Sequence, residues 1–272
     1  GYGGHTQQML KCLEGKGHLY ALDADPIEIA KTKERLEKLG YGPEILTIKH
    51  LNFANIDEVV TQAGQFDFVL ADLGISSMQV DNPDRGFSYK REGPLDLRLD
   101  PQKGISAAER LKSITQEELE GMLMENADEP YAEAISKAIV SAIEKGTDIS
   151  TTTQLKQLVE TALKFISAAE RTEAIKKSCQ RTFQALRVDV NSEFEVLYTF
   201  LEKLPDVLAK GGRVAILTFH SGEDRLVKKS FKSLQRDGVY SEIANEVIRP
   251  SVEECNMNSR ARSAKMRWAI KA

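Results

Sequence analysis

Short apolar runs alternate with amphipathic segments in the first quarter of the chain. The apolar runs are rich in Leu, Ile, Val and Phe, and they predict strands at 18–23, 45–53 and 66–73. Between them, apolar residues recur at helical spacing, which predicts helices at 26–36 and 56–63. Because strands and helices alternate, we expect a parallel sheet with helices on both of its faces.

Polar residues mark the starts of three predicted helices. Asp25 is a good N-cap, and Pro26 after it suits the first helical position. Thr115 and Glu118 have the spacing of a capping box, and Thr151 opens a further helix.

The alternation stops after the third strand. Residues 74–104 form a long segment rich in Gly, Pro, Asp and Arg, and from 105 to about 184 every clear signal is helical. A helix, a strand at 213–219, a basic helix to Arg236 and a last strand at 266–270 follow. We therefore predict a doubly wound α/β domain made of residues 1–104 and 185–272, with an all-helical insert at 105–184.

Composition and charge narrow the class of protein. Hydrophobic residues make up 41% of the 272 and charged residues 29%, which is typical of a globular protein. No apolar run is long enough to span a membrane, and three irregularly spaced cysteines suit a reducing cytoplasm. The net charge is −4, yet residues 225–236 and 257–272 each hold five basic residues and no acidic one.

A glycine turn stands at the start of the sequence. Gly3 and Gly4 precede a predicted helix, whose free N–H groups would attract a carboxylate or phosphate. Asp23 follows Gly3 by 20 residues, at a strand end where it could accept the hydroxyls of a ribose. Thr6 replaces the third small residue of a dinucleotide motif, which favours S-adenosylmethionine. A structural turn is the alternative.

No strand is predicted before this turn. A nucleoside-binding turn normally follows a strand. The sequence therefore leaves two interpretations, a motif whose leading strand lies outside these residues or a flexible glycine terminus.

Charged residues follow the third strand. Asp72 lies at its carboxyl end, where open α/β sheets bind ligands, although a capping role for Asp72 is the alternative. Arg85, Asp96, Arg98 and Asp100 lie on the glycine-hinged loop after it. They could form a lid that grips RNA, or salt bridges within a surface loop.

Two polar segments follow later. His220 begins a His-Ser-Gly-Glu-Asp cluster, but neither a hydrolase elbow nor metal-ligand spacing accompanies it, so we predict no metal site. This histidine could contact substrate or pack at a helix start. Residues 258–265 are basic with small spacers and would suit phosphates or a solvated face.

These motifs together resemble the cytidine N4-methyltransferase family of small-subunit (16S) ribosomal RNA. The resemblance covers nearly the whole chain in the right order. It is carried by the segments GYGGHT, ALDADP, DLGISSMQVDNPDRGFSYKREGPLDLRLDP, RVDVNSE, GGRVAILTFHSGEDRLVKK and NSRARSAKMR. It implies a Rossmann-like methyltransferase domain interrupted by a small helical, RNA-recognising domain. The implied reaction transfers a methyl group from S-adenosylmethionine to the exocyclic amine of a cytidine in the decoding region.

The resemblance also implies roles for residues. The positions matching the family's cofactor contacts are Gly3, Gly4, His5, Asp23, Phe53, Asp72 and Gln79. The acceptor of the amine proton is Asp72, Asp96 or Asp100, and the sequence does not choose between them. Candidate substrate contacts are Arg98, His220, Arg260, Arg262 and Lys265.

The expected partner is small-subunit ribosomal RNA, either naked or in an assembled subunit. We expect no membrane partner, and the chain could form a homodimer. Two rival functions remain at this point. One is a methyltransferase acting on another amine, and the other is a non-catalytic RNA-binding assembly factor.

Overall fold

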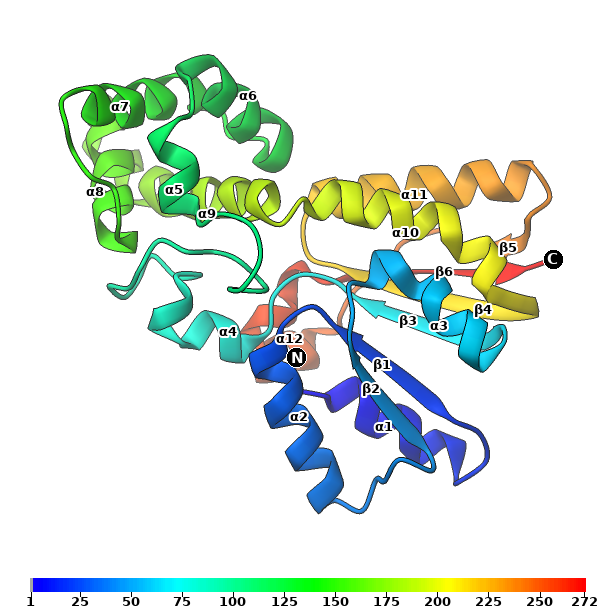
Figure 1. Cartoon of the computed structure of the whole chain (residues 1–272). Coiled ribbons are helices and arrows are strands. Elements are labelled where there is room, and N and C mark those ends of the chain that lie inside the picture. Colours follow the sequence, from blue (N-terminus) through cyan, green and yellow to red (C-terminus); the bar gives the residue numbers. More distant parts are fainter. Residues whose placement is uncertain (1) are drawn as a thin grey trace. The chain divides into compact units, whose positions relative to one another are not determined.

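The computed structural model describes residues 2–272, which divide into two compact units (Figure 1). The first, here called the sheet unit, contains residues 3–74 and 194–272. The second, the helical unit, contains residue 2 and residues 75–193. The chain is thus a mixed α/β protein, as predicted.

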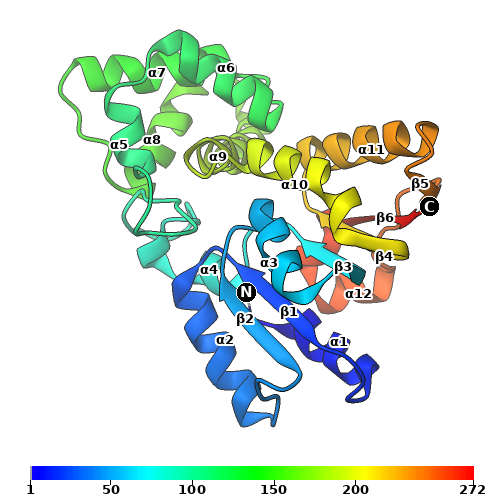
Figure 2. The same ribbon diagram turned by 45° about the vertical axis from the view of Figure 1, so that its right-hand side comes forward.

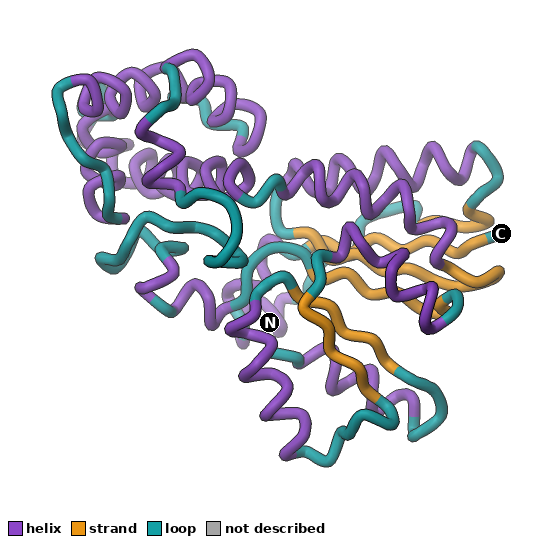
Figure 3. Tube along the Cα trace, in the orientation of Figure 1, coloured by secondary structure: helices purple, strands orange, loops and turns teal. Residues whose placement is uncertain are grey.

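The sheet unit contains all six strands of the described residues (Figure 3). Its N-terminal part consists of α1 (Gly4–Leu13), β1 (Leu19–Asp23), α2 (Pro26–Lys38), β2 (Leu46–His50), the 3₁₀ turn η1 (Phe53–Asn55), α3 (Ile56–Ala63) and β3 (Phe66–Asp72). Its C-terminal part consists of α10 (Glu193–Val207), β4 (Leu208–Thr218), α11 (Ser221–Arg236), β5 (Tyr240–Ile243), α12 (Val252–Met257), η3 (Ser259–Ser263) and β6 (Lys265–Lys271).

These strands form two sheets. In the first, β1 pairs with β2 in parallel. The second has the order β3-β4-β6-β5, with β3 and β4 parallel and β6 antiparallel to both of its neighbours. The expected parallel pairing is therefore correct for the first four strands, while β5 and β6 add an antiparallel edge.

One edge each of β1 and β3 has no strand partner among the described residues. The ring of Tyr20 on β1 lies 6.0 Å from that of Phe66 on β3, so the two strands begin near each other. All five residues of β1 are only half-buried, and Phe68 in the middle of β3 is 44% exposed. Apolar strands of a doubly wound sheet are normally buried on both faces.

Helices α10 and α11 lie along the same face of the four-stranded sheet (Figures 1 and 2). Leu201 of α10, Phe231 of α11 and Ile216 of β4 belong to one buried apolar cluster. The spacing of Val227 and Phe231 puts both on the buried side of α11, which leaves the basic residues of this helix exposed. Burial of this apolar side fixes which side of α11 faces the solvent.

The helical unit holds the remaining helices around a separate core. They are α4 (Ser77–Asp81), η2 (Pro83–Arg85), α5 (Ala107–Lys112), α6 (Gln116–Ala127), α7 (Ala132–Glu144), α8 (Thr152–Ala162) and α9 (Ala168–Val190). Asp128 ends α6 in a left-handed conformation (φ 49°). The carboxylate of Glu129 accepts a hydrogen bond from the N–H of Tyr131, just before α7.

The limits of this unit differ from the predicted insert at 105–184. They lie at residues 75 and 193, because the loop after β3 packs with the helices. Phe87, Leu95 and Leu97 of that loop are buried in the helical core. Pro94 also bridges to Thr151 at the start of α8. The loop therefore belongs to the helical unit by its contacts, although its composition suited either a lid or a surface loop.

Arg85 and two glycines hold the loop together. The buried Arg85 guanidinium donates hydrogen bonds to the carbonyls of Arg98 (3.0 Å) and Leu99 (2.9 Å). Gly86 has a φ of +73°, and a Cβ there would overlap the Pro94 carbonyl oxygen. A Cβ at Gly93 would likewise overlap the backbone of Pro83. Only glycine permits such close backbone approach.

None of the helices in the described part of the chain combines the length and the apolar character that crossing a membrane requires.

Candidate functional site

The glycine turn forms the start of α1, as predicted. Gly3 is the N-cap residue with a left-handed φ of 76°, and Gly4 is the first helical residue. A Cβ at Gly3 would lie 2.7 Å from the Cγ2 of Thr32 on α2, so the close packing of α1 against α2 requires glycine here. The turn thus presents the N–H groups of the first turn of α1, which attract anionic groups.

Two predicted residues lie where β1 and β2 end. Asp23 is the last residue of β1, and its Oδ1 accepts a hydrogen bond from the N–H of Asp25 (2.9 Å). Asp25 in turn caps α2, as predicted. Phe53 begins the 3₁₀ turn after β2, and its ring packs edge-on against that of Phe200 at 5.2 Å.

Asp72 is the last residue of β3 and contacts α1. The Nδ1 of His5 donates a hydrogen bond to the Oδ2 of Asp72 at 3.0 Å. The Asp72 side chain is 45% exposed, so its carboxylate is also open to solvent. This hydrogen bond joins the glycine turn to the end of β3 and brings two residues far apart in sequence to one place.

The pKa of His5 is raised above its ordinary value of 6.5, chiefly by the hydrogen bond to Asp72. The folded state therefore holds this proton more tightly than the unfolded state does. The contribution to stability is full below the ordinary pKa and is lost as pH rises through the raised value. We expect Asp72→Asn to lower the pKa of His5, as measured by NMR titration of the imidazole. The other histidines provide the internal control, and an unchanged His5 titration would contradict the role of this contact.

Gln79, the last of the predicted cofactor contacts, belongs to the helical unit, whereas the other predicted cofactor contacts belong to the sheet unit. Its Oε1 accepts the N–H of Ser76 at 2.7 Å, and its own N–H bonds the Ser76 hydroxyl, so the two residues form the capping box of α4. The resemblance groups Gln79 with the cofactor contacts, and the capping box fixes where its side chain lies at the start of α4.

The other two predicted acids also lie in the helical unit. Arg98 donates to both carboxylate oxygens of Asp96 at 2.8 Å, and although burial opposes it, this pairing holds the pKa of Asp96 below its ordinary value. Asp100 is buried, accepts the N–H of Gln102 and lies 3.5 Å from the Nζ of Lys103. Arg98 and both acids therefore make ion pairs within their own loop.

His220 is the N-cap residue of α11, and its side chain is only 10% exposed. Its Nε2 lies 3.3 Å from a carboxylate oxygen of Glu223, whose other oxygen accepts the N–H of Phe219. The sequence left two roles open for His220, and the structure shows it packed at a helix start.

The basic segment before β6 is mostly exposed. Arg260 and Arg262 lie exposed on η3. Lys265 differs, because it is largely buried with its Nζ 3.6 Å from Asp224. Asp224 also pairs with Arg267 at 2.7 Å. The sequence did not predict this ion pair, since it depends on how α11 packs against β6.

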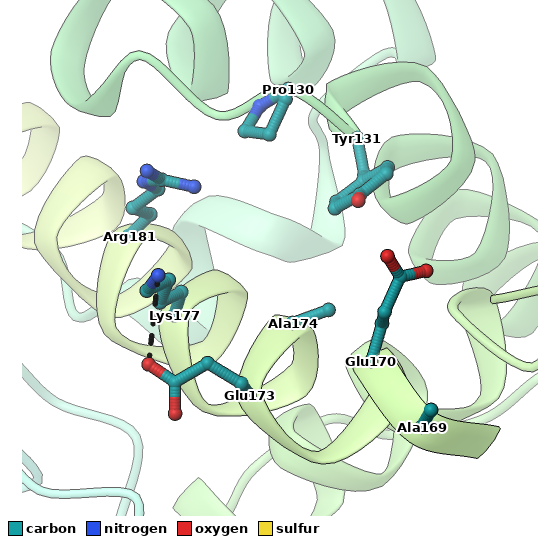
Figure 4. A pocket seen from close by; sticks show the side chains of 8 residues that line it. All are labelled: Pro130, Tyr131, Ala169, Glu170, Glu173, Ala174, Lys177 and Arg181. Carbon is teal, nitrogen blue, oxygen red and sulfur yellow. Dashed lines mark ion pairs between the residues drawn. The ribbon is translucent and has the colours of Figure 1, made fainter. Parts of the chain in front are cut away.

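A pocket of about 570 Å³ opens on the helical unit between the start of α7 and α9 (Figure 4). Tyr131, Lys177 and Arg181 line it together with two glutamates, and Lys177 pairs with one of these, Glu173, at 3.6 Å. None of the residues predicted from the sequence lines this pocket.

Comparisons with known proteins agree with the motifs. The profile of the MraW methylase family matches residues 1–272. The chain is 75% identical to "Ribosomal RNA small subunit methyltransferase H 1" of Lachnoclostridium phytofermentans, over all of this chain and 74% of that protein. It is 70% identical to "Ribosomal RNA small subunit methyltransferase H 2" of Alkaliphilus metalliredigens, over all of this chain and 78% of that protein. A more distant relative from Leptothrix cholodnii is 39% identical over 99% of this chain and 84% of its own length.

Proposed function

Because this chain belongs to the MraW methylase family, we propose that it transfers the methyl group of S-adenosylmethionine to the N4 amine of a cytidine in the decoding region of 16S ribosomal RNA. The observation that carries this proposal is the contact between His5, beside the glycine turn, and the exposed Asp72 at the end of β3. It joins a turn suited to a nucleoside cofactor to an acid suited to accept a proton. A protein that only bound RNA would need neither.

We propose that the two sheets are parts of one Rossmann-like, doubly wound sheet interrupted by the helical unit. The supporting observations are the parallel β1-β2 and β3-β4 pairs and the short distance between the starts of β1 and β3, each of which has one edge without a strand partner among the described residues. One further parallel strand between these edges would join the sheets and cover the half-buried residues of β1.

The sheet unit fits S-adenosylmethionine at the proposed positions. The turn at Gly3 has no room for a Cβ, and the first-turn N–H groups of α1 suit the carboxylate of the cofactor. Asp23 would accept the ribose hydroxyls, and Phe53 would flank the adenine. The full proposed set is Gly3, Gly4, His5, Asp23, Phe53, Asp72 and Gln79. When bound, the cofactor supplies an electrophilic methyl group on a sulfonium.

Among the three acids left open by the sequence, we assign the proton-accepting role to Asp72. The amine of cytosine is a poor nucleophile because its lone pair is delocalised, so an acceptor is needed as positive charge develops on the nitrogen. Asp96 is held by two hydrogen bonds from Arg98, and Asp100 is buried beside Lys103. Asp72 is exposed, and among the residues that the structure describes its one ion-pair partner is His5.

The RNA would present an unpaired or flipped cytidine to this site. We propose Arg260, Arg262 and Lys265 as phosphate contacts around it, and keep Arg98 and His220 as candidate contacts. Neutralising both arginines (Arg260→Gln with Arg262→Gln) is expected to weaken RNA binding severalfold. It should also make the slope of log K for RNA binding against log salt concentration shallower by about 1.4. Binding measured across a salt series tests this. S-adenosylmethionine affinity should not change, and unchanged RNA binding would leave the arginines as a solvated surface.

The test of the function is transfer of labelled methyl to small ribosomal subunits that lack their own cytidine N4-methylation, followed by nucleoside mass spectrometry. Label in N4-methylcytidine is the expected result. Label in another product, or cofactor binding without label, would contradict the assigned substrate. Naked RNA assayed in parallel shows whether the assembled subunit is required. We place the reaction in the cytoplasm, and the homodimer stays a prediction.

A further inference from the structure

One face of α11 carries a row of basic side chains. Each member lies three or four residues from at least one other member, which puts the row on the side of the helix away from the buried Val227 and Phe231. All of them are exposed: Arg225, Lys228, Lys229, Lys232 and Arg236. From the first to the last the row is about 16 Å long, enough to follow several consecutive phosphates.

Three lysines of this row have no side-chain partner among the described residues. Lys228, Lys229 and Lys232 have no ion pair or hydrogen bond with any residue that the structure describes. No acidic residue occurs between Arg225 and Arg236 that could pair with them. Like charges at this spacing repel each other and destabilise a helix.

Helix α2 of the same unit shows the usual arrangement. Its exposed lysines pair with glutamates three or four residues away, namely Lys31 with Glu28 (3.3 Å), Lys33 with Glu37 (3.9 Å) and Lys38 with Glu34 (2.6 Å). In a chain with a net charge of −4, the three lysines of α11 that have no partner among the described residues are therefore not a consequence of composition.

The position of α11 relates the row to the site. Leu217 of β4 pairs with Asp72 of β3, and α11 begins four residues after Leu217. Lys265, which follows η3, pairs with Thr218 at the same end of β4. The row on α11 therefore starts at the strand ends that carry Asp72 and runs away from them.

We propose that this face of α11 binds the phosphate backbone of the RNA substrate and so leads the RNA to the strand ends at Asp72. The inference rests on the proposed function. An anionic membrane is the less suitable partner, because a helix that lies on a membrane buries an apolar face in the lipid. The apolar face of α11 is instead buried in the core of the sheet unit.

The test neutralises the three unpaired lysines together (Lys228→Gln, Lys229→Gln and Lys232→Gln). A matched control on α2 (Lys31→Gln, Lys33→Gln and Lys38→Gln) changes the net charge equally and removes three ion pairs besides. Binding to unmethylated small ribosomal subunits is measured over a salt series, with methyl transfer and S-adenosylmethionine affinity measured alongside.

We expect the α11 variant to bind subunits about tenfold more weakly, and its slope of log K against log salt concentration should become shallower by about 2. The KM for subunits should rise, while S-adenosylmethionine affinity stays unchanged. The α2 control should behave as the unmodified protein. A third variant with three Lys→Arg changes on α11 keeps the charge and should retain binding.

Two results would overturn the inference while leaving the function intact. In the first, the unmodified protein transfers methyl groups, but the α11 and α2 variants bind subunits equally well. In the second, the α11 variant binds subunits as the unmodified protein does, but it no longer binds phosphatidylserine vesicles in a parallel assay. Absence of methyl transfer by the unmodified protein would instead contradict the proposed function itself.

Discussion

Replacing Asp72 by Asn is expected to slow methyl transfer by about 10²- to 10⁴-fold, while S-adenosylmethionine affinity changes by less than about threefold. An amide keeps the size and the hydrogen-bonding oxygen of the side chain but cannot take up a proton. If Asp72 accepts the proton of the cytidine amine, the loss is in kcat. Single-turnover methyl transfer and equilibrium cofactor binding separate these two quantities.

A matched control lies on the same strand. Asp67 is exposed near the start of β3, so Asp67→Asn makes the same chemical change away from the strand end. This variant should retain full activity. If Asp72→Asn weakens cofactor binding by the same factor as turnover, Asp72 is a cofactor ligand and the proton acceptor must be sought elsewhere.

The second large effect concerns the stability of the helical unit. Gly86→Ala is expected to destabilise it by about 3 kcal/mol or more, because the new methyl group adds a backbone overlap to an unfavourable φ. The overlap is with the carbonyl of Pro94, whose neighbour Leu95 is buried in the helical core. Neither the Pro94 carbonyl nor the packed chain around it can move without disturbing that core.

Gly146→Ala is the control for the backbone conformation alone. Gly146 has a φ of +85°, and a Cβ there would meet no atom within 4 Å. Its cost should therefore be about 1 kcal/mol. Hydrogen exchange of helical-unit peptides in a urea series measures both variants, with sheet-unit peptides as the internal reference. Equal costs for the two variants would show that the overlap at Gly86 relaxes freely.

Local signals predicted much of the fold. Asp25 caps α2, and the Thr115–Glu118 and Thr151 signals mark helix starts where the structure has them. Such caps involve residues within one turn, so a sequence pattern contains all the information they need. The short strand β5 was missed because its four residues, Tyr240–Ile243, show little alternation and depend on pairing with β6.

Long-range contacts set the features that the sequence did not predict. The loop after β3 has the Gly, Pro and charged composition of a surface segment, yet Leu95 and Leu97 in it are almost fully buried. Their burial depends on α5 and α9, and Asn191 at the end of α9 bonds the Leu97 carbonyl at 2.7 Å. No local pattern could place the boundary at residue 75.

The site was predicted in part. Placement of Gly3, Asp23 and Asp72 at element ends followed from the α/β pattern, and the structure has each of them there. The contact of His5 with Asp72 could not be predicted, because it joins residues 67 positions apart. The functional roles of these residues stay predictions until the variants are measured.

The pairing of β3 with β4 has a consequence for synthesis on the ribosome. Phe66 pairs with Leu208, and residues 75–193 of the helical unit lie between them in the sequence. At the usual rate of translation the edge of β3 waits for its partner for about 7 to 28 seconds. Helices built from local contacts fold far faster than this. The helical unit can therefore fold first during translation and draw the two halves of the sheet together, which shortens the loop that β4 must close.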